Sequence, residues 1–185
     1  MTRIIAGAAG SLPLEVPGSG TRPTSDRVRE SLFGSLETRG LDDLAVLDLY
    51  AGSGALGIEA VSRGAASADL VEKAPRAVAV IERNIRRVER AIGPGRLRPH
   101  RAAADAFLAS TRTSFDLVFL DPPYDLAETE LADTLTLVAE RLAPEGIVIV
   151  ERATRSGVPV LPSGLVLERE RRYGDTTLWW LLSAE

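Results

Sequence analysis

Between residues 45 and 151 the chain alternates short apolar runs with longer amphipathic stretches, and this pattern restricts the possible folds most. The apolar runs predict strands at residues 45–49, 68–72, 96–101, 115–120 and 146–151. The intervening stretches predict helices at residues 55–63, 75–92, 104–110 and 128–142. Strands that alternate with helices form a parallel sheet with helices on both faces. The central part of the chain therefore predicts an α/β, Rossmann-like fold.

The two ends depart from this alternation. Residues 165–173 and 176–182 flank Gly174 and Asp175, a turn pair typical of β-hairpins. Added to the five parallel strands, this hairpin gives a seven-stranded mixed sheet. Residues 1–20 are rich in Gly and Pro and predict a small β-hairpin flap, followed by a helix capped by Thr24 or Ser25 and ending near Thr38. We therefore divide the chain into a flap at residues 1–20 and a main domain at residues 21–185.

The composition excludes several classes of protein. The chain of 185 residues has no cysteine and a single histidine, His100, so it offers neither a disulfide framework nor a cysteine-based or multi-histidine metal site. No apolar run approaches the roughly 20 residues that span a bilayer. The N-terminus lacks the apolar stretch of a signal peptide. The net charge of −4 argues against a uniformly basic coat for nucleic acid. We expect a cytoplasmic protein without a metal and without membrane association.

A glycine-rich turn follows the first predicted strand. Gly52, Gly54 and Gly57 match the spacing G-x-G-x-x-G of a dinucleotide-binding turn, and Glu72 ends the next strand, where ribose would bind. A nicotinamide-dependent dehydrogenase is therefore one possibility. Asp48 favours another, because a carboxylate beside the turn would repel a pyrophosphate and attract an ammonium group. S-adenosylmethionine carries such a group.

The sequence Asp121-Pro122-Pro123-Tyr124 follows the predicted strand at residues 115–120. Ligands bind outside the carboxyl ends of the strands in open α/β sheets. Two prolines make this turn rigid and remove two N–H donors. The Asp121 carboxylate and the Pro122 carbonyl can accept hydrogen bonds from a planar amine, and Tyr124 can stack on its face. The alternative is a purely structural turn with a half-buried tyrosine.

Together the two motifs resemble the class I S-adenosylmethionine-dependent methyltransferases that act on exocyclic amines of bases. The segment from Arg22 to Phe33, read with residues 3–7, resembles the start of the RsmD family, whose members methylate N2 of a guanine in 16S ribosomal RNA. The later motifs fit the same family in the same order, so the resemblance covers essentially the whole chain. It implies the class I methyltransferase fold and S-adenosyl-L-methionine as the cofactor.

The resemblance also implies roles for individual residues. The cofactor-binding set is Asp48, Tyr50, Gly52, Ser53, Gly54, Glu72, Lys73, Asp105, Ala106 and Asp121. Within it, Glu72 is expected to bind the ribose, Asp105 the adenine amino group, and the Ala106 N–H a ring nitrogen. Asp121, Pro122 and Tyr124 are the expected catalytic residues. The candidates for RNA contact are Arg3, Arg22, Thr24 and Arg27.

The expected partner is 16S rRNA within an assembled or partly assembled 30S subunit, bound by a monomer. Two alternatives are a methyltransferase for an exocyclic amine of another nucleic acid, and a methyltransferase-like module that holds RNA without turnover. The flap at residues 1–20 is expected to cover RNA, so its deletion would leave folding largely intact and lower RNA binding. The alternative is a structural hairpin that seals the sheet or the following helix.

Overall fold

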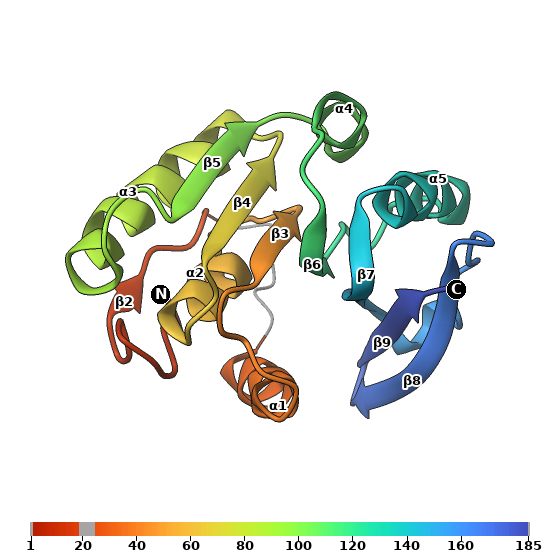
Figure 1. Cartoon of the computed structure of the whole chain (residues 1–185), viewed down its shortest axis with the longest axis horizontal. Coiled ribbons are helices and arrows are strands. Elements are labelled where there is room, and N and C mark those ends of the chain that lie inside the picture. The colour runs from red at the N-terminus through yellow and green to blue at the C-terminus, as the bar shows by residue number, and fades with distance from the viewer. Residues whose placement is uncertain (1, 19–24, 185) are drawn as a thin grey trace.

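The computed structural model describes residues 2–18 and 25–184 and has a seven-stranded mixed sheet at its centre (Figure 1). The strand order is β5-β4-β3-β6-β7-β9-β8. Neighbours from β5 to β7 are parallel, and β9 pairs antiparallel with both β7 and β8. The strands are β3 (Ala45–Leu49), β4 (Ser67–Glu72), β5 (Leu97–Arg101), β6 (Phe115–Leu120), β7 (Leu142–Ala153), β8 (Leu165–Tyr173) and β9 (Thr176–Ser183). The predicted seven-stranded mixed sheet is confirmed.

Helices cover both faces of the sheet. One hydrophobic cluster joins the sheet to α1 (Asp26–Glu37), α2 (Ala55–Ser62) and α3 (Pro75–Ile92). A second cluster joins the opposite face to α4 (Ala104–Ser110) and α5 (Glu128–Ala139). The paired tryptophans of β9 are divided between the two clusters, because neighbouring residues of a strand point to opposite faces. A short 3-10 helix, Thr154–Ser156, follows β7. No helix in the described ranges is long and apolar enough to cross a membrane.

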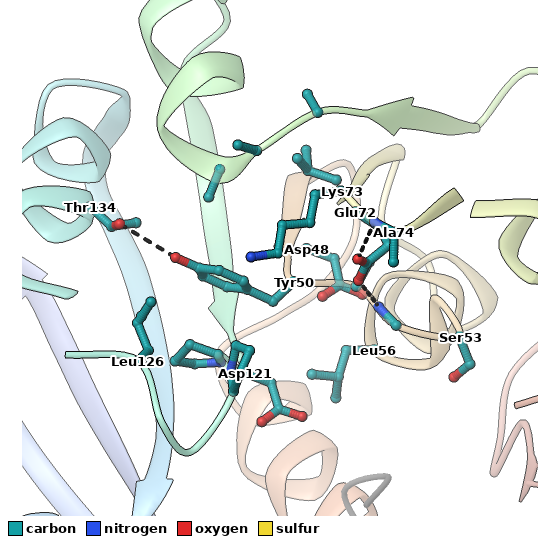
Figure 2. Close-up of a pocket in the computed structure, with 18 of the residues that line it drawn as sticks. Asp48, Tyr50, Ser53, Leu56, Glu72, Lys73, Ala74, Asp121, Leu126 and Thr134 are labelled. Carbon is teal, nitrogen blue, oxygen red and sulfur yellow. Dashed lines mark hydrogen bonds between the residues drawn. The ribbon is translucent and has the colours of Figure 1, made fainter. Parts of the chain in front are cut away.

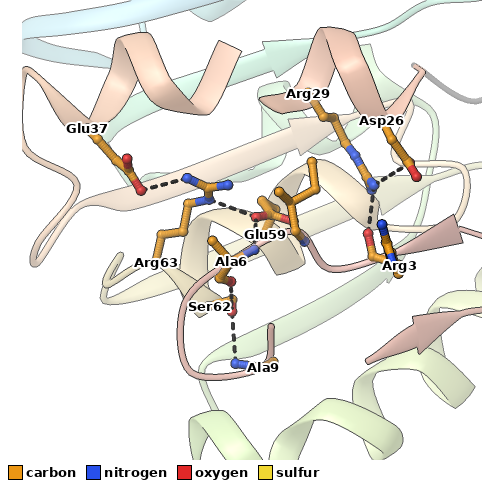
Figure 3. Close-up of polar contacts among 10 residues, drawn as sticks. Arg3, Ala6, Ala9, Asp26, Arg29, Glu37, Glu59, Ser62 and Arg63 are labelled. Atoms are coloured by element: carbon orange, nitrogen blue, oxygen red, sulfur yellow. Dashed lines mark hydrogen bonds and ion pairs between the residues drawn. The ribbon is translucent and has the colours of Figure 1, made fainter. Parts of the chain in front are cut away.

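The N-terminal segment is packed against the helices of the first face. Its strands β1 (Thr2–Arg3) and β2 (Pro13–Leu14) pair antiparallel, and the side chains of Ile4, Ala9 and Leu14 are buried in the larger cluster. Glu59 of α2, itself fully buried, accepts the N–H groups of Ile5 and Ala6 at 2.8 and 3.0 Å. Ser62 adds contacts with Ala6 and Ala9 (Figure 3). The predicted hairpin is present, and its described backbone is anchored to the core.

The main error in the predicted elements lies between α5 and β7. The predicted helix at residues 128–142 ends at Ala139, and β7 begins at Leu142 rather than at residue 146. Pro144 has no N–H and restricts the residue before it, which disfavours further helix. The carbonyl of Arg141 instead accepts the N–H of Phe115 at 2.8 Å, at the start of β6. Sheet pairing therefore outweighs the helical periodicity here.

Candidate active site

A cavity of about 860 Å³ opens at the carboxyl ends of β3, β4 and β6. From β3 the chain proceeds to β4 and β5 on one side, and β6 and β7 lie on the other side, so the cavity lies where the direction of strand order changes. Its lining is strongly acidic: the only basic residues are Arg29 and Lys73. The acidic lining residues are Asp48, Glu72, Asp105, Asp121, Asp125, Glu130 and Asp133. Such a lining suits a ligand that carries positive charge.

Asp48 forms the floor of this cavity. It lies near the end of β3, is 1% exposed, and accepts the N–H of Gly57 through Oδ2 at 2.9 Å. Burial raises the pKa of the Asp48 carboxyl to about 7; the Gly57 hydrogen bond lowers this pKa, and the charge of Glu72 raises it further. A cation bound beside Asp48 would stabilise its ionised form.

The glycine turn has the geometry that its spacing predicts. Gly54, the N-cap of α2, has a φ of 78°, a left-handed conformation that glycine adopts without strain. A Cβ on Gly57 would lie 2.2 Å from the Leu70 side chain, so only glycine lets α2 pack this closely on β4. Gly52 and Ser53 line the cavity, whereas Gly54 shapes the turn without lining it.

Glu72 and Asp105 mark one end of the cavity. The Glu72 carboxylate accepts the N–H of Gly52 at 3.1 Å and of Ala74 at 2.8 Å, which fixes its position at the end of β4 (Figure 2). Asp105 lines the cavity at the start of α4. Ala106 does not line it, and its N–H donates to Asp105 Oδ1 at 2.8 Å. The role expected for the Ala106 N–H would require that contact to open.

The Asp121-Pro122-Pro123-Tyr124 turn forms the opposite wall. Asp121 and Tyr124 both line the cavity, and the Tyr124 side chain is 48% exposed, so its ring is accessible to a ligand. Arg152, at the far end of β7 and 4% exposed, holds this turn. Its guanidinium donates to the carbonyls of Pro123 and Leu126 at 3.4 and 3.2 Å and to Glu128 at 2.7 Å.

Tyr50 and Lys73 complete the set of predicted cofactor residues in the cavity. The Tyr50 hydroxyl lies 3.4 Å from Thr134 Oγ1, and burial raises the pKa of this phenol. Figure 2 shows the Lys73 side chain extending from the end of β4 toward the Tyr50 ring. Both residues border the space between Glu72 and Asp121.

The predicted RNA-contact residues lie outside the cavity lining. Arg3 and Arg27 have exposed side chains near the N-terminal segment and the start of α1. Arg22 and Thr24 lie outside the residues that the structure describes. Ser25 caps α1, with its Oγ accepting the Val28 N–H at 3.3 Å, so the second of the two predicted caps is confirmed.

Three buried side chains near the site were missed by the sequence reasoning. Arg152 holds the Asp121 turn, and Arg29 lines the cavity from α1. Asn84 of α3 donates to the carbonyls of Ser53 and Glu15, both at 2.9 Å, and so joins the glycine turn to the N-terminal segment. Their partners lie far away in sequence, so no local motif indicates them.

Comparison with known proteins places this geometry in a family. The model of the family described as "Conserved hypothetical protein 95" matches residues 2–182. Ribosomal RNA small subunit methyltransferase D of Escherichia coli is 38% identical over 176 residues, which are 94% of this chain and 85% of that protein. A solved Escherichia coli structure, described as a candidate methyltransferase, aligns with a TM-score of 0.86 and 34% identity over 98% of this chain and 97% of that one.

A Thermus thermophilus structure aligns similarly, with a TM-score of 0.82 and 32% identity over 97% of this chain and 98% of that one. These matches extend over both the N-terminal segment and the sheet. They agree with the resemblance carried by the motifs of the sequence. The chain therefore belongs to the "Conserved hypothetical protein 95" family, the RsmD family of methyltransferases.

Proposed function

We propose that this protein transfers a methyl group from S-adenosyl-L-methionine to N2 of a guanine in 16S rRNA of the small ribosomal subunit. The observation that carries the proposal is the position of Asp121 and Tyr124 in the same acidic cavity as Asp48 and Glu72. One pair of residues suits a flipped base with an amino group, and the other suits a nucleoside with an ammonium group. The relatives named as rRNA small subunit methyltransferases support rRNA as the acceptor.

The residues present fit such a donor. The cavity volume of about 860 Å³ lies within the usual range for ligand pockets. Glu72, fixed by two backbone N–H groups, can accept both ribose hydroxyls. Asp48 can bind the ammonium group, and Asp105 the adenine amino group. When bound, S-adenosylmethionine supplies an activated methyl group on a sulfonium.

Positioning is then the main task of the protein. Tyr124 would stack on the extruded guanine, and Asp121 with the Pro122 carbonyl would accept the two N–H bonds of the amine. This alignment directs the nitrogen lone pair at the methyl carbon. A new N–C bond forms as the C–S bond breaks, and the amine proton passes to Asp121 or to solvent. Positioning of this kind can lower a barrier by roughly 7–11 kcal/mol.

A dehydrogenase is disfavoured by the charge of the cavity. Two phosphates of a dinucleotide would face Asp48 and the other acidic residues of the lining, with only Arg29 and Lys73 as counter-charges. Calorimetric titration with S-adenosylmethionine and with a nicotinamide dinucleotide separates the two cofactor classes. We expect binding of the first only.

The acceptor is tested by methyl transfer from labelled donor to free 16S rRNA, 30S subunits and DNA, all from a strain that lacks the activity. We expect transfer to rRNA or to 30S subunits and none to DNA. Transfer to DNA alone would favour the alternative acceptor. Binding of RNA without any transfer would favour a module that holds RNA and does not turn over.

A further inference from the structure

Arg29 is a buried charge that the structure leaves only partly satisfied. Its side chain is 1% exposed, and its hydrogen bonds all run through Nη2, to Thr2 Oγ1 at 3.0 Å, the Arg3 carbonyl at 2.7 Å and Asp26 Oδ1 at 2.8 Å (Figure 3). Its Nε and Nη1 are buried and have no hydrogen-bond partner among the described residues. An unpaired buried N–H costs about 1–3 kcal/mol, and more when the group is charged.

The neighbouring acids do not meet this need. Burial lowers the pKa of Arg29, and the charges of Asp26 and Glu59 oppose that shift. Asp26 contacts Nη2 and is itself largely exposed. Glu59 receives two backbone N–H groups and the Nε of Arg63. Arg29 therefore has an unmet demand for an anion, although carboxylates surround it.

Arg29 lines the cavity together with Ala55 and Leu56, the first two residues of α2. The N-cap of α2, Gly54, supplies no side-chain hydrogen bond. The start of a helix carries partial positive charge and favours an anion. Two independent features, a helix start and an incompletely paired guanidinium, thus face the same end of the cavity.

The rest of the cavity decides which anion fits. Acidic residues dominate the lining, so the anion has to arrive on a ligand that also carries positive charge. An amino-acid end has both charges: its ammonium can lie near Asp48 while its carboxylate reaches Arg29. An RNA phosphodiester fits poorly, because chain continues on both sides of it and a 1% exposed guanidinium is reached only by a small terminal group.

We propose that Arg29 and the start of α2 bind the carboxylate of the methyl donor's amino-acid end. The inference rests on the proposed function, since it takes S-adenosylmethionine as the donor. It adds a binding residue from α1, whose Nη2 also holds the N-terminal segment through the Arg3 carbonyl. Donor binding and the anchoring of that segment would then share one side chain.

The test compares S-adenosylmethionine with decarboxylated S-adenosylmethionine, which keeps the ammonium group and the sulfonium but lacks the carboxylate. Calorimetry on the full chain measures both affinities. We expect the wild type to prefer the complete donor by about tenfold or more, the value of a charge-assisted hydrogen bond. Arg29→Gln should weaken binding of the complete donor by about 10- to 100-fold and of the decarboxylated donor by less than about threefold.

Lys73→Gln is the matched control, because Lys73 is the other cation of the cavity. We expect it to change the two affinities by the same factor. Arg29→Lys, which keeps the charge, should recover part of the preference and remain folded if Arg29→Gln does not. Thermal unfolding of each variant reports whether the fold is intact.

Three results would overturn the inference. One is a wild-type preference below about threefold, a measurement that needs no variant. Another is an equal loss of both affinities in Arg29→Gln, which would mean a structural role alone. The third is an unchanged preference combined with weaker RNA binding, which would assign Arg29 to a phosphate. If the wild type binds neither donor, the proposed function fails as well, so the two failures are distinguishable.

Discussion

At the scale of single residues, Asp48 links cofactor chemistry to stability. Its folded-state pKa of about 7 lies above the ordinary value of 3.8, so the folded protein holds a proton that the unfolded chain releases within this range. The contribution of Asp48 to stability is therefore complete below about pH 3.8 and is lost as the pH rises through about 7.

Asp48→Asn removes this titration while the amide oxygen can still accept the Gly57 N–H. Between about pH 5.5 and 8.5, the unfolding free energy of the unliganded wild type should fall by about 2 kcal/mol relative to that of Asp48→Asn. Denaturant unfolding at several pH values measures the difference. A difference that does not change with pH would mean that Asp48 is already ionised in the folded protein at low pH.

Asp121 and Glu72 should have opposite phenotypes although both are carboxylates of one cavity. Asp121→Ala should abolish turnover and leave cofactor affinity nearly unchanged, since its proposed contacts are with the acceptor amine. Glu72→Ala should weaken cofactor binding by roughly 1.5–3 kcal/mol, the value of charge-assisted hydrogen bonds. Calorimetry and single-turnover transfer separate these effects. A loss of activity below about tenfold in Asp121→Ala would falsify its role.

The residues found from the sequence and those missed differ in how their contacts are made. Asp48, Glu72 and Asp121 each lie at a strand end beside a turn motif, and their positions follow from local pattern. Asn84 contacts Glu15 across 69 positions, and Arg152 contacts Pro123 across 29. Long-range contacts of this kind depend on how elements pack, which a single sequence does not display.

At the scale of elements, β7 positions the turn that follows β6. Arg152→Lys keeps a charge but cannot reach the carbonyls of Pro123 and Leu126 and also Glu128, as the guanidinium does. We expect kcat to fall by about tenfold or more, with donor affinity little changed. The matched control is Arg155→Lys, an exposed position a few residues later, which should retain activity. Loss of donor binding in Arg152→Lys would indicate a general structural role instead.

The N-terminal segment combines two roles that variants can separate. Its backbone is held by Glu59, so Glu59→Gln should lower the unfolding free energy by about 3 kcal/mol, because a buried charge network loses its acceptor. Arg3, with an exposed side chain, is proposed to contact RNA. Arg3→Gln should leave melting unchanged, weaken RNA binding and reduce its salt slope by about one.

This anchoring changes what deletion of residues 1–20 is expected to do. Because Ile4, Ala9 and Leu14 are fully buried, removal should destabilise the fold and not only RNA binding. The buried contacts favour the structural alternative for the backbone of the segment, while its proposed RNA role passes to exposed side chains. A truncated protein that is as stable as the full chain would contradict this account.

At the scale of the whole molecule, the alternation of strands and helices was sufficient to predict the architecture. It predicted five parallel strands, and the Gly174-Asp175 turn predicted the two antiparallel strands that complete the sheet. The division of the helices between the two faces was only implicit, because it depends on the spatial order of the strands. The change from α5 to β7 was missed because the apolar period continues through residues that pair with β6.

The central claim is that the aligned cavity methylates the exocyclic amine of a guanine. The most direct measurement is nucleoside analysis of 16S rRNA after 30S subunits from a strain lacking the activity are incubated with the protein and labelled donor. The account predicts label in N2-methylguanosine alone, and no label when Asp121→Ala replaces the wild type. Label in another nucleoside, or on another atom of guanine, would contradict it.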